Sequence, residues 1–224
     1  MANSGAPGVG NYARNAERLV PGYRHLQQMA CLLLAEEVGS GGQVLVVGAG
    51  GGSELKVFAE THPDWSFVGV DPSKEMLDLA QTTLGAAAAR VEFHEGYVVD
   101  APTGPFDGAT CLLTLHFLPR EERKMTLVEI AKRLKPGAPL VVAHHSFPVS
   151  PEEKKRWLSR YAEFSVALGV PRENAEKAID AIDQRLPVSS PEEDVEILAE
   201  AGFRSMQLFY AGFTFKGWVG YRSP

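Results

Sequence analysis

The sequence predicts an α/β fold in which helices cover both faces of a doubly wound, mostly parallel sheet of seven strands. Two observations carry this prediction. Five apolar runs without polar alternation are separated by segments of helical spacing, a pattern typical of parallel strands buried on both faces. The chain then ends in two strand-like runs joined by a short turn, and so short a link requires an antiparallel pair.

The individual elements follow from the same patterns. Apolar positions in residues 11–38 predict two short helices, which Pro21 and Gly22 separate. Strands are expected at residues 43–47, 65–70, 90–94, 107–115, 139–144, 203–210 and 212–221, the last two joined by a glycine-containing turn. Helices are expected at residues 53–60, 74–84, 120–134, 150–168, 171–184 and 190–202. Ser150 and Ser190 each open an S-P-E-E segment, so a capping box is predicted at both.

The composition excludes several classes of protein. A chain of 224 residues, 45% of them hydrophobic, suits one ordinary domain. Its formal charge of −6 argues against a nucleic-acid partner, which would require phosphate neutralisation. Cys31 and Cys111 have no partner at metal spacing and indicate reduced, buried thiols. Because neither a leader pattern nor an apolar stretch of membrane length is present, we expect a soluble, cytoplasmic protein without membrane contacts.

A glycine-rich turn follows the first predicted strand. Residues 44–54 read VLVVGAGGGSE, so a strand is followed by a turn without side chains and then by a helix. The backbone N–H groups of such a turn and the positive N-terminal end of the helix dipole can both face a ligand. No Gly-Lys-Ser/Thr follows, which disfavours a triphosphate loop, and Ser53 breaks the dinucleotide pattern G-x-G-x-x-G. The spacing of Gly48, Gly50 and Gly52 fits the form that binds S-adenosylmethionine better. A plain tight turn remains an alternative.

Asp71 strengthens the interpretation as a nucleoside site. It ends the second predicted strand, about twenty residues past the glycines, where a carboxylate can accept both ribose hydroxyls. An alternative is that Asp71 caps the helix that begins near Pro72, and the two roles are compatible.

The order of motifs resembles that of the class I S-adenosylmethionine-dependent methyltransferases, whose fold is Rossmann-like. The segments that carry the resemblance are VLVVGAGGG, FVGVDPSKEML, VEFHEGYV, FDGATCLLTLHFLP and LKPGAPLVVA. Within that class the chain resembles the group of carboxy-S-adenosylmethionine synthases and tRNA wobble-uridine methyltransferase-like proteins, through LVPGYRHLQQM, TLHFLPREER and AEAGFRSMQLFY.

The resemblance implies a single domain and a set of cofactor residues. Its segments would be a flexible start (1–10), an N-terminal helical lid (11–38), a cofactor-binding core (39–146), a helical lid insertion (147–188) and a last helix with the C-terminal hairpin (189–224). Tyr23 would fold over the cofactor. The other residues implied to contact S-adenosylmethionine are Gly48, Ala49, Gly50, Gly52, Asp71, Pro72, Met76, Tyr97, Val98 and Leu112. Members of the resembled group often pair, which permits a homodimer here without requiring one.

Several positions depart from the family pattern. Val46 stands where an acidic residue usually neighbours the methionyl ammonium, and Tyr97 stands where an aspartate usually reads the adenine, a role that Asp100 could take. Carboxy-S-adenosylmethionine synthases hold the extra carboxylate with an asparagine and an arginine, and here those places are Leu112 and Pro187. Arg185 lies close enough in sequence to compensate. These departures favour a plain methyl donor.

The catalytic candidates lie at the carboxyl ends of the strands, where open α/β sheets bind their ligands. His116 follows the fourth predicted strand, and Tyr23 lies in the lid. His144 and His145 end the fifth strand, so at most one of them should face the site. A general base is needed only for an acceptor that must lose a proton. We expect no metal, because no acidic partner has ligand spacing.

The lid segments would set the acceptor. Residues 153–164 mix basic side chains with Trp157 and Tyr161, which permits RNA binding, but the aromatic spacing is better explained as one buried helix face. Aromatic content on both lids, including Tyr12 beside Arg14, suits a partly apolar small molecule. The leading hypothesis is therefore a methyltransferase for a small organic acceptor. The alternatives are carboxy-S-adenosylmethionine formation or another tRNA-modification step, and a non-catalytic S-adenosylmethionine-binding protein.

Overall fold

A seven-stranded sheet forms the centre of the structure, a computed structural model that describes residues 15–224. The strand order is β3-β2-β1-β4-β5-β7-β6, and β7 is antiparallel to both β5 and β6 while the first five strands are parallel. The strands are β1 (Gln43–Val47), β2 (Ser66–Asp71), β3 (Val91–Glu95), β4 (Gly108–Leu112), β5 (Pro139–His145), β6 (Phe203–Gly212) and β7 (Phe215–Arg222). The predicted fold class is confirmed. The expected flexible start (1–10), Tyr12 and Arg14 lie outside the described residues.

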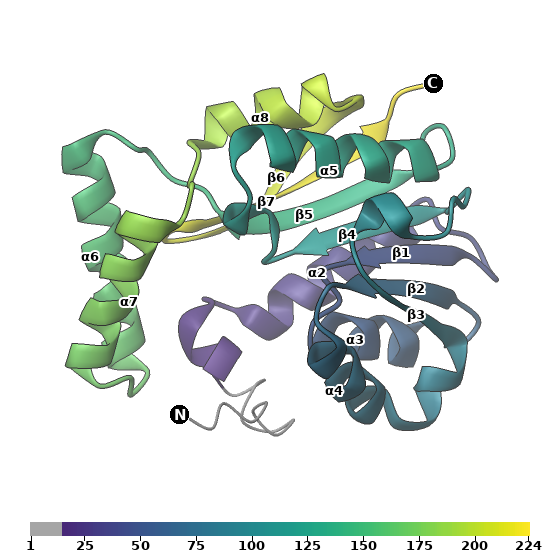
Figure 1. Ribbon diagram of the computed structural model, residues 1–224, viewed down its shortest axis with the longest axis horizontal. Helices are drawn as coiled ribbons and strands as arrows, with labels where there is room; N and C mark the ends of the chain where they lie inside the picture. The colour runs from purple at the N-terminus through teal and green to yellow at the C-terminus, as the bar shows by residue number, and fades with distance from the viewer. Residues whose placement is uncertain (1–14) are drawn as a thin grey trace.

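Helices cover both faces of this sheet (Figure 1). On one face lie α2 (Tyr23–Ala35), α3 (Ser53–Thr61) and α4 (Lys74–Leu84), and on the other lie α5 (Arg120–Arg133) and α8 (Pro191–Glu200). The helices α6 (Pro151–Ala167) and α7 (Arg172–Arg185) pair as a hairpin at the side of the sheet. No helix among residues 15–224 is long and apolar enough to cross a bilayer.

Two apolar cores result from the alternation of side chains along the strands. In β1, Val44 and Val46 face the core beneath α2 and α3, whereas Leu45 and Val47 face the core beneath α5 and α8. Both faces of the parallel strands are therefore dry, which explains their unbroken apolar sequence.

Three local predictions differ from the structure. The strand predicted at 107–115 ends at Leu112, because Leu113 is left-handed (φ +58°) and Leu115–Phe117 form a 3₁₀ turn, η3. The hairpin turn contains no glycine, since Gly212 still pairs with Phe215. Ser190 forms the predicted capping box with Glu193, whereas the Ser150 hydroxyl donates to the Glu153 carboxylate and caps no backbone group.

Candidate functional site

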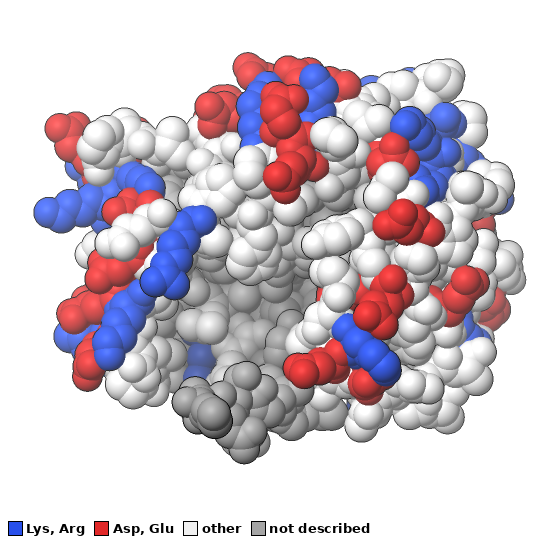
Figure 2. All heavy atoms as spheres, viewed as in Figure 1, with Lys and Arg blue, Asp and Glu red and all other residues white. Residues whose placement is uncertain are grey.

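A cavity of about 870 Å³ lies at the carboxyl ends of β1, β2 and β4, the edge at which parallel sheets bind ligands. The predicted cofactor residues that line it are Tyr23, Gly48, Ala49, Gly50, Asp71, Pro72, Met76, Tyr97, Val98 and Leu112. They come from α2, the glycine turn and the ends of three strands, so the fold brings together segments far apart in sequence. Figure 2 shows this face of the molecule hollowed between the α6–α7 hairpin and the sheet, with mostly uncharged side chains inside the hollow.

The glycine turn is held tightly against the end of β2. The Gly48 and Ala49 amides both donate to the Val70 carbonyl, at 2.8 and 3.0 Å. A Cβ at Gly48 would lie 2.0 Å from Thr114 Oγ1, so only glycine fits there. Gly52 is different: it does not line the cavity, and its missing side chain allows close packing on Ala80 of α4.

The Asp71 carboxylate joins the two halves of the site. One oxygen accepts the Gly50 amide at 2.9 Å, and the other accepts the Ser73 amide at 2.9 Å. Ser73, not Asp71, is the N-cap of α4, since its hydroxyl accepts from the Met76 amide. Each carboxylate oxygen retains a lone pair, and Asp71 lines the cavity.

Comparison with known proteins gives this site its family. Residues 44–137 match the family described as a methyltransferase domain. The carboxy-S-adenosyl-L-methionine synthase of Chromohalobacter salexigens is 27% identical over 210 residues, which covers 92% of this chain and 77% of that protein. Residues 44–137 carry a methyltransferase domain, and the chain resembles the class I S-adenosylmethionine-dependent methyltransferases in sequence and fold. Within this class the methyltransferase resembles the carboxy-S-adenosylmethionine synthase group, and S-adenosylmethionine is its cofactor.

Two further similarities agree with that family. The O-methyltransferase resE of Aspergillus sclerotiorum is 27% identical over 197 residues, covering 84% of the present chain and 66% of that protein. The structure of human N-acetylserotonin methyltransferase in complex with S-adenosylmethionine has a TM-score of 0.60 at 16% identity, and it shares the fold. The methyltransferase described here spans 62% of that longer chain.

Glu54 is a cavity residue that the sequence analysis missed. It lies in the first turn of α3, and its side chain lines the cavity although the residue is only 7% exposed. Burial, and secondarily the Asp71 charge, raises the pKa of Glu54 to about 8. Among residues 15–224, no lysine or arginine forms an ion pair with it. A glutamate in the first turn of a helix is ordinary, so only the fold reveals that this one is buried.

The rim beyond β3 is apolar. Val98 is buried and Tyr97 is 65% exposed, and both line the cavity beside Met76. Asp100, the alternative reader of the adenine, is exposed and does not line the cavity. Tyr97 and Val98, and not Asp100, are therefore the predicted residues that could contact an adenine beyond the end of β3.

The histidine candidates of this methyltransferase do not line the cavity. His116, His144 and His145 are all buried. The His116 Nδ1 accepts a hydrogen bond from the His145 backbone amide at 3.4 Å, and His145 Nδ1 lies 3.0 Å from Oγ1 of Thr214, in the turn between β6 and β7. Burial lowers the pKa of His116 well below its ordinary value and that of His145 to about 3, with neighbouring histidines acting in the same direction. Both rings are consequently neutral.

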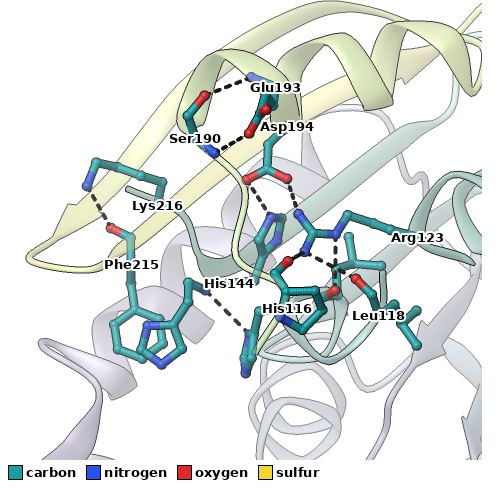
Figure 3. Close-up of polar contacts among 12 residues, drawn as sticks. His116, Leu118, Arg123, His144, Ser190, Glu193, Asp194, Phe215 and Lys216 are labelled. Atoms are coloured by element: carbon teal, nitrogen blue, oxygen red, sulfur yellow. Dashed lines mark hydrogen bonds and ion pairs between the residues drawn. The ribbon is translucent and has the colours of Figure 1, made fainter. Parts of the chain in front are cut away.

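His144 belongs to a closed cluster formed by Arg123, His144 and Asp194 (Figure 3). Arg123 is 1% exposed; its guanidinium pairs with the Asp194 carboxylate and also donates to the Leu115 and Pro187 carbonyls. The other Asp194 oxygen lies 3.2 Å from His144 Nε2. Burial opposes the charge of Asp194, but His144 and Arg123 hold its pKa below the usual value. The cluster ties α5 and α8 to the end of β5.

Two remaining expectations concern metals and RNA. Within residues 15–224, no three His, Cys, Asp or Glu side chains are grouped so that they could hold a metal ion. Tyr161 is buried, and Trp157 is flanked by Arg160 (4.7 Å) and Lys216 (5.2 Å), so its ring is already covered by cations. These contacts favour a structural role for the basic, aromatic face of α6.

Proposed function

We propose that this methyltransferase moves the methyl group of S-adenosylmethionine to a small organic acceptor. The observation that carries the proposal is the cavity beside the glycine turn, whose walls are mainly apolar and include the carboxyl groups of buried Glu54 and half-buried Asp71. Two carboxylates and a glycine turn suit a cationic nucleoside. The apolar walls suit an organic acceptor rather than a polyanion.

The proposed roles of the lining residues follow their places. Gly48, Ala49 and Gly50 would meet the methionine end of the cofactor, and Asp71 would accept the ribose hydroxyls. The adenine would lie among Met76, Tyr97 and Val98, and Leu112 would close the site from β4. Tyr23, the first residue of α2, would cover the cofactor. Gly52 would act indirectly, by letting α4 approach the turn.

Bound S-adenosylmethionine supplies a methyl group that is already activated on a sulfonium. The chain would therefore contribute mainly alignment of the acceptor with the methyl group, which lowers a barrier by about 7–11 kcal/mol. We propose that neither His116 nor His144 removes a proton from the acceptor, because both are buried outside the cavity. Such a site suits an acceptor atom that is nucleophilic near neutral pH. Of the predicted catalytic residues, Tyr23 is the one that lines the cavity.

Two helical segments would cover the acceptor. We propose that the N-terminal segment up to residue 38 and the insertion at 147–188 act as lids on one domain, because α2 lines the cavity and the α6–α7 hairpin borders the hollow in Figure 2. A homodimer stays a prediction, which light scattering of the purified chain tests. We also place the enzyme in the cytoplasm, where the buried thiols of Cys31 and Cys111 would stay reduced.

Carboxy-S-adenosylmethionine formation is the second candidate, and the name of the Chromohalobacter relative favours it. The chemistry of the cavity does not. Leu112 presents a hydrocarbon side chain, Arg185 is exposed and does not line the cavity, and Arg123 is held by Asp194. Lys124 and Lys132 also line the cavity, but they already pair with Glu200 and Glu129. A carboxylate placed beside Leu112 would face hydrocarbon instead of a basic group, at a cost of several kcal/mol.

Labelled methyl transfer tests the proposal. The enzyme should transfer label from methyl-labelled S-adenosylmethionine to a member of a panel of aromatic amines, thiols and acidic phenols, whose acceptor atoms are nucleophilic near neutral pH. The control is Gly48→Val, which should lose cofactor binding because its Cβ would overlap Thr114. A carboxylated cofactor found by mass spectrometry after purification would overturn the plain-donor proposal. Absence of heat with both S-adenosylmethionine and S-adenosylhomocysteine in calorimetry would overturn the site.

A further inference from the structure

We propose that Glu54 is the carboxylate that binds the amino group of the cofactor's methionine portion, replacing the acidic side chain that Val46 does not supply. This inference rests on the proposed placement of the cofactor in the cavity, and it assigns a binding residue where the family pattern leaves a gap. Val46 is fully buried in the core beneath α2 and α3, so its side chain packs in that core and offers no polar group to a ligand.

The position of Glu54 is the first argument. The residue is 93% buried, yet its side chain lines the cavity together with Gln27 of α2 and Leu113 at the end of β4. Glu54 therefore follows the glycine turn in the chain and shares the cavity wall with α2, the helix expected to cover the cofactor. The adenine end, at Met76 and Val98, lies on the other side of Asp71 along the sheet edge.

The missing partner is the second argument. Buried carboxylates are normally paired or hydrogen-bonded, since an isolated buried charge is costly. Asp194 follows this rule through Arg123, whereas Glu54 has only the hydrogen bond from its own backbone amide and no ion pair in the part of the chain that the structure describes. Its surroundings add a further negative charge from Asp71 instead of a positive one. A ligand cation would supply what the protein omits.

The proton balance of binding is a consequence of this arrangement. With a pKa of about 8, Glu54 is mostly protonated in the free protein at pH 7. An ammonium group that pairs with it would stabilise the carboxylate, so the proton would leave to solvent as the ligand enters. Binding should therefore release close to one proton at pH 7 and less at pH 9.

Three ligands separate the groups that Glu54 could meet. S-adenosylmethionine carries both the amino group and the sulfonium, S-adenosylhomocysteine carries only the amino group, and 5′-methylthioadenosine carries neither. Glu54→Gln should weaken binding of the first two equally, by about 10- to 100-fold, and leave the third unchanged. It should also abolish most of the proton release, measured by calorimetry in buffers of different ionisation enthalpy. Glu60→Gln, exposed on the same helix, is the control.

Each other result counts against the inference. Loss confined to S-adenosylmethionine would assign Glu54 to the sulfonium, and equal loss of all three ligands would indicate damage to the site. Unchanged binding in Glu54→Gln, with a parent that binds, would refute the inference while leaving the proposed function intact. A parent that binds none of the ligands would refute both. Circular dichroism of the variant establishes that it is folded, and Glu54→Asp should recover part of the proton release.

Discussion

Two groups of charged side chains lie along the same edge of the sheet and differ in one respect. The open carboxylate pair, Glu54 and Asp71, faces a cavity and has no basic partner among the described residues. The closed cluster of Arg123, His144 and Asp194 is buried like Glu54, whereas Asp71 is half-buried. The carboxylate of the closed cluster is paired with a guanidinium and faces no cavity. Burial therefore does not distinguish Glu54 from the closed cluster. The presence or absence of a protein partner does.

This difference separates binding from architecture. A carboxylate that already has its cation stabilises the contact between α5 and α8 and has little to offer a ligand. A carboxylate without one destabilises the free protein and gains when a cation arrives. On this view the histidines near the closed cluster belong to the framework, although their place at strand ends resembles that of catalytic groups.

The largest effect is expected from breaking the closed cluster. Arg123→Met would leave the buried Asp194 charge with His144 as its remaining partner, and should lower the free energy of unfolding by about 3–5 kcal/mol. Urea denaturation measures it. The double variant Arg123→Met/Asp194→Leu should recover most of the loss, because no charge remains buried alone. Arg120→Met, which breaks only an exposed pair with Glu200, should cost at most about 1 kcal/mol. Equal losses for the two arginines would contradict the comparison.

Removing the Glu54 charge from the open carboxylate pair should have the opposite effect and raise the free energy of unfolding. The folded state raises the pKa of Glu54 from 4.5 to about 8, so stability is full below pH 4.5 and is lost as the pH rises toward 8. Glu54→Gln should therefore increase the free energy of unfolding by on the order of 4 kcal/mol at pH 8 and change little at pH 4.5. Thermal unfolding at both pH values measures this.

The acid side of the profile provides the control for that variant. The folded state lowers the pKa of His145 from 6.5 to about 3, so its contribution is full above pH 6.5 and is lost as the pH falls toward 3. This loss should persist unchanged in Glu54→Gln. If Glu54→Gln removed both the acid-side and the alkaline-side loss of stability, the titrations of Glu54 and His145 would be coupled.

Asp71→Asn should have an intermediate effect. An amide can accept only one of the two backbone N–H bonds from Gly50 and Ser73, so the turn loosens and a charge-assisted bond to ribose is lost. We expect about 2 kcal/mol weaker binding, or about 30-fold, by calorimetry. Unlike Glu54→Gln, this variant should also weaken 5′-methylthioadenosine, because that ligand keeps the ribose. Unchanged binding of all three ligands would remove Asp71 from the site.

Much of the fold was predictable, because unbroken apolar runs such as Val44–Val47 and the short link to the last strand each allow few arrangements. The cavity residues at Gly48 and Asp71 were predictable from spacing. Arg123 and Asp194 were not, since they lie 71 residues apart on helices whose other charged residues, except Arg133, are exposed or half-buried. The left-handed Leu113 was also hidden, because an apolar run does not reveal where a strand becomes a 3₁₀ turn.

The smallest effect is expected at His116, the candidate base of the sequence analysis. Its Nδ1 already accepts the His145 amide, its pKa lies well below the ordinary value, and its ring does not line the cavity. His116→Asn should therefore leave turnover within about threefold of the parent, less than about 1 kcal/mol in the barrier. The measurement is single-turnover methyl transfer at saturating cofactor, with calorimetry to show that binding persists. A hundredfold loss with intact binding would return His116 to the reacting centre, and would mean that a buried, partnered group can still act on the acceptor.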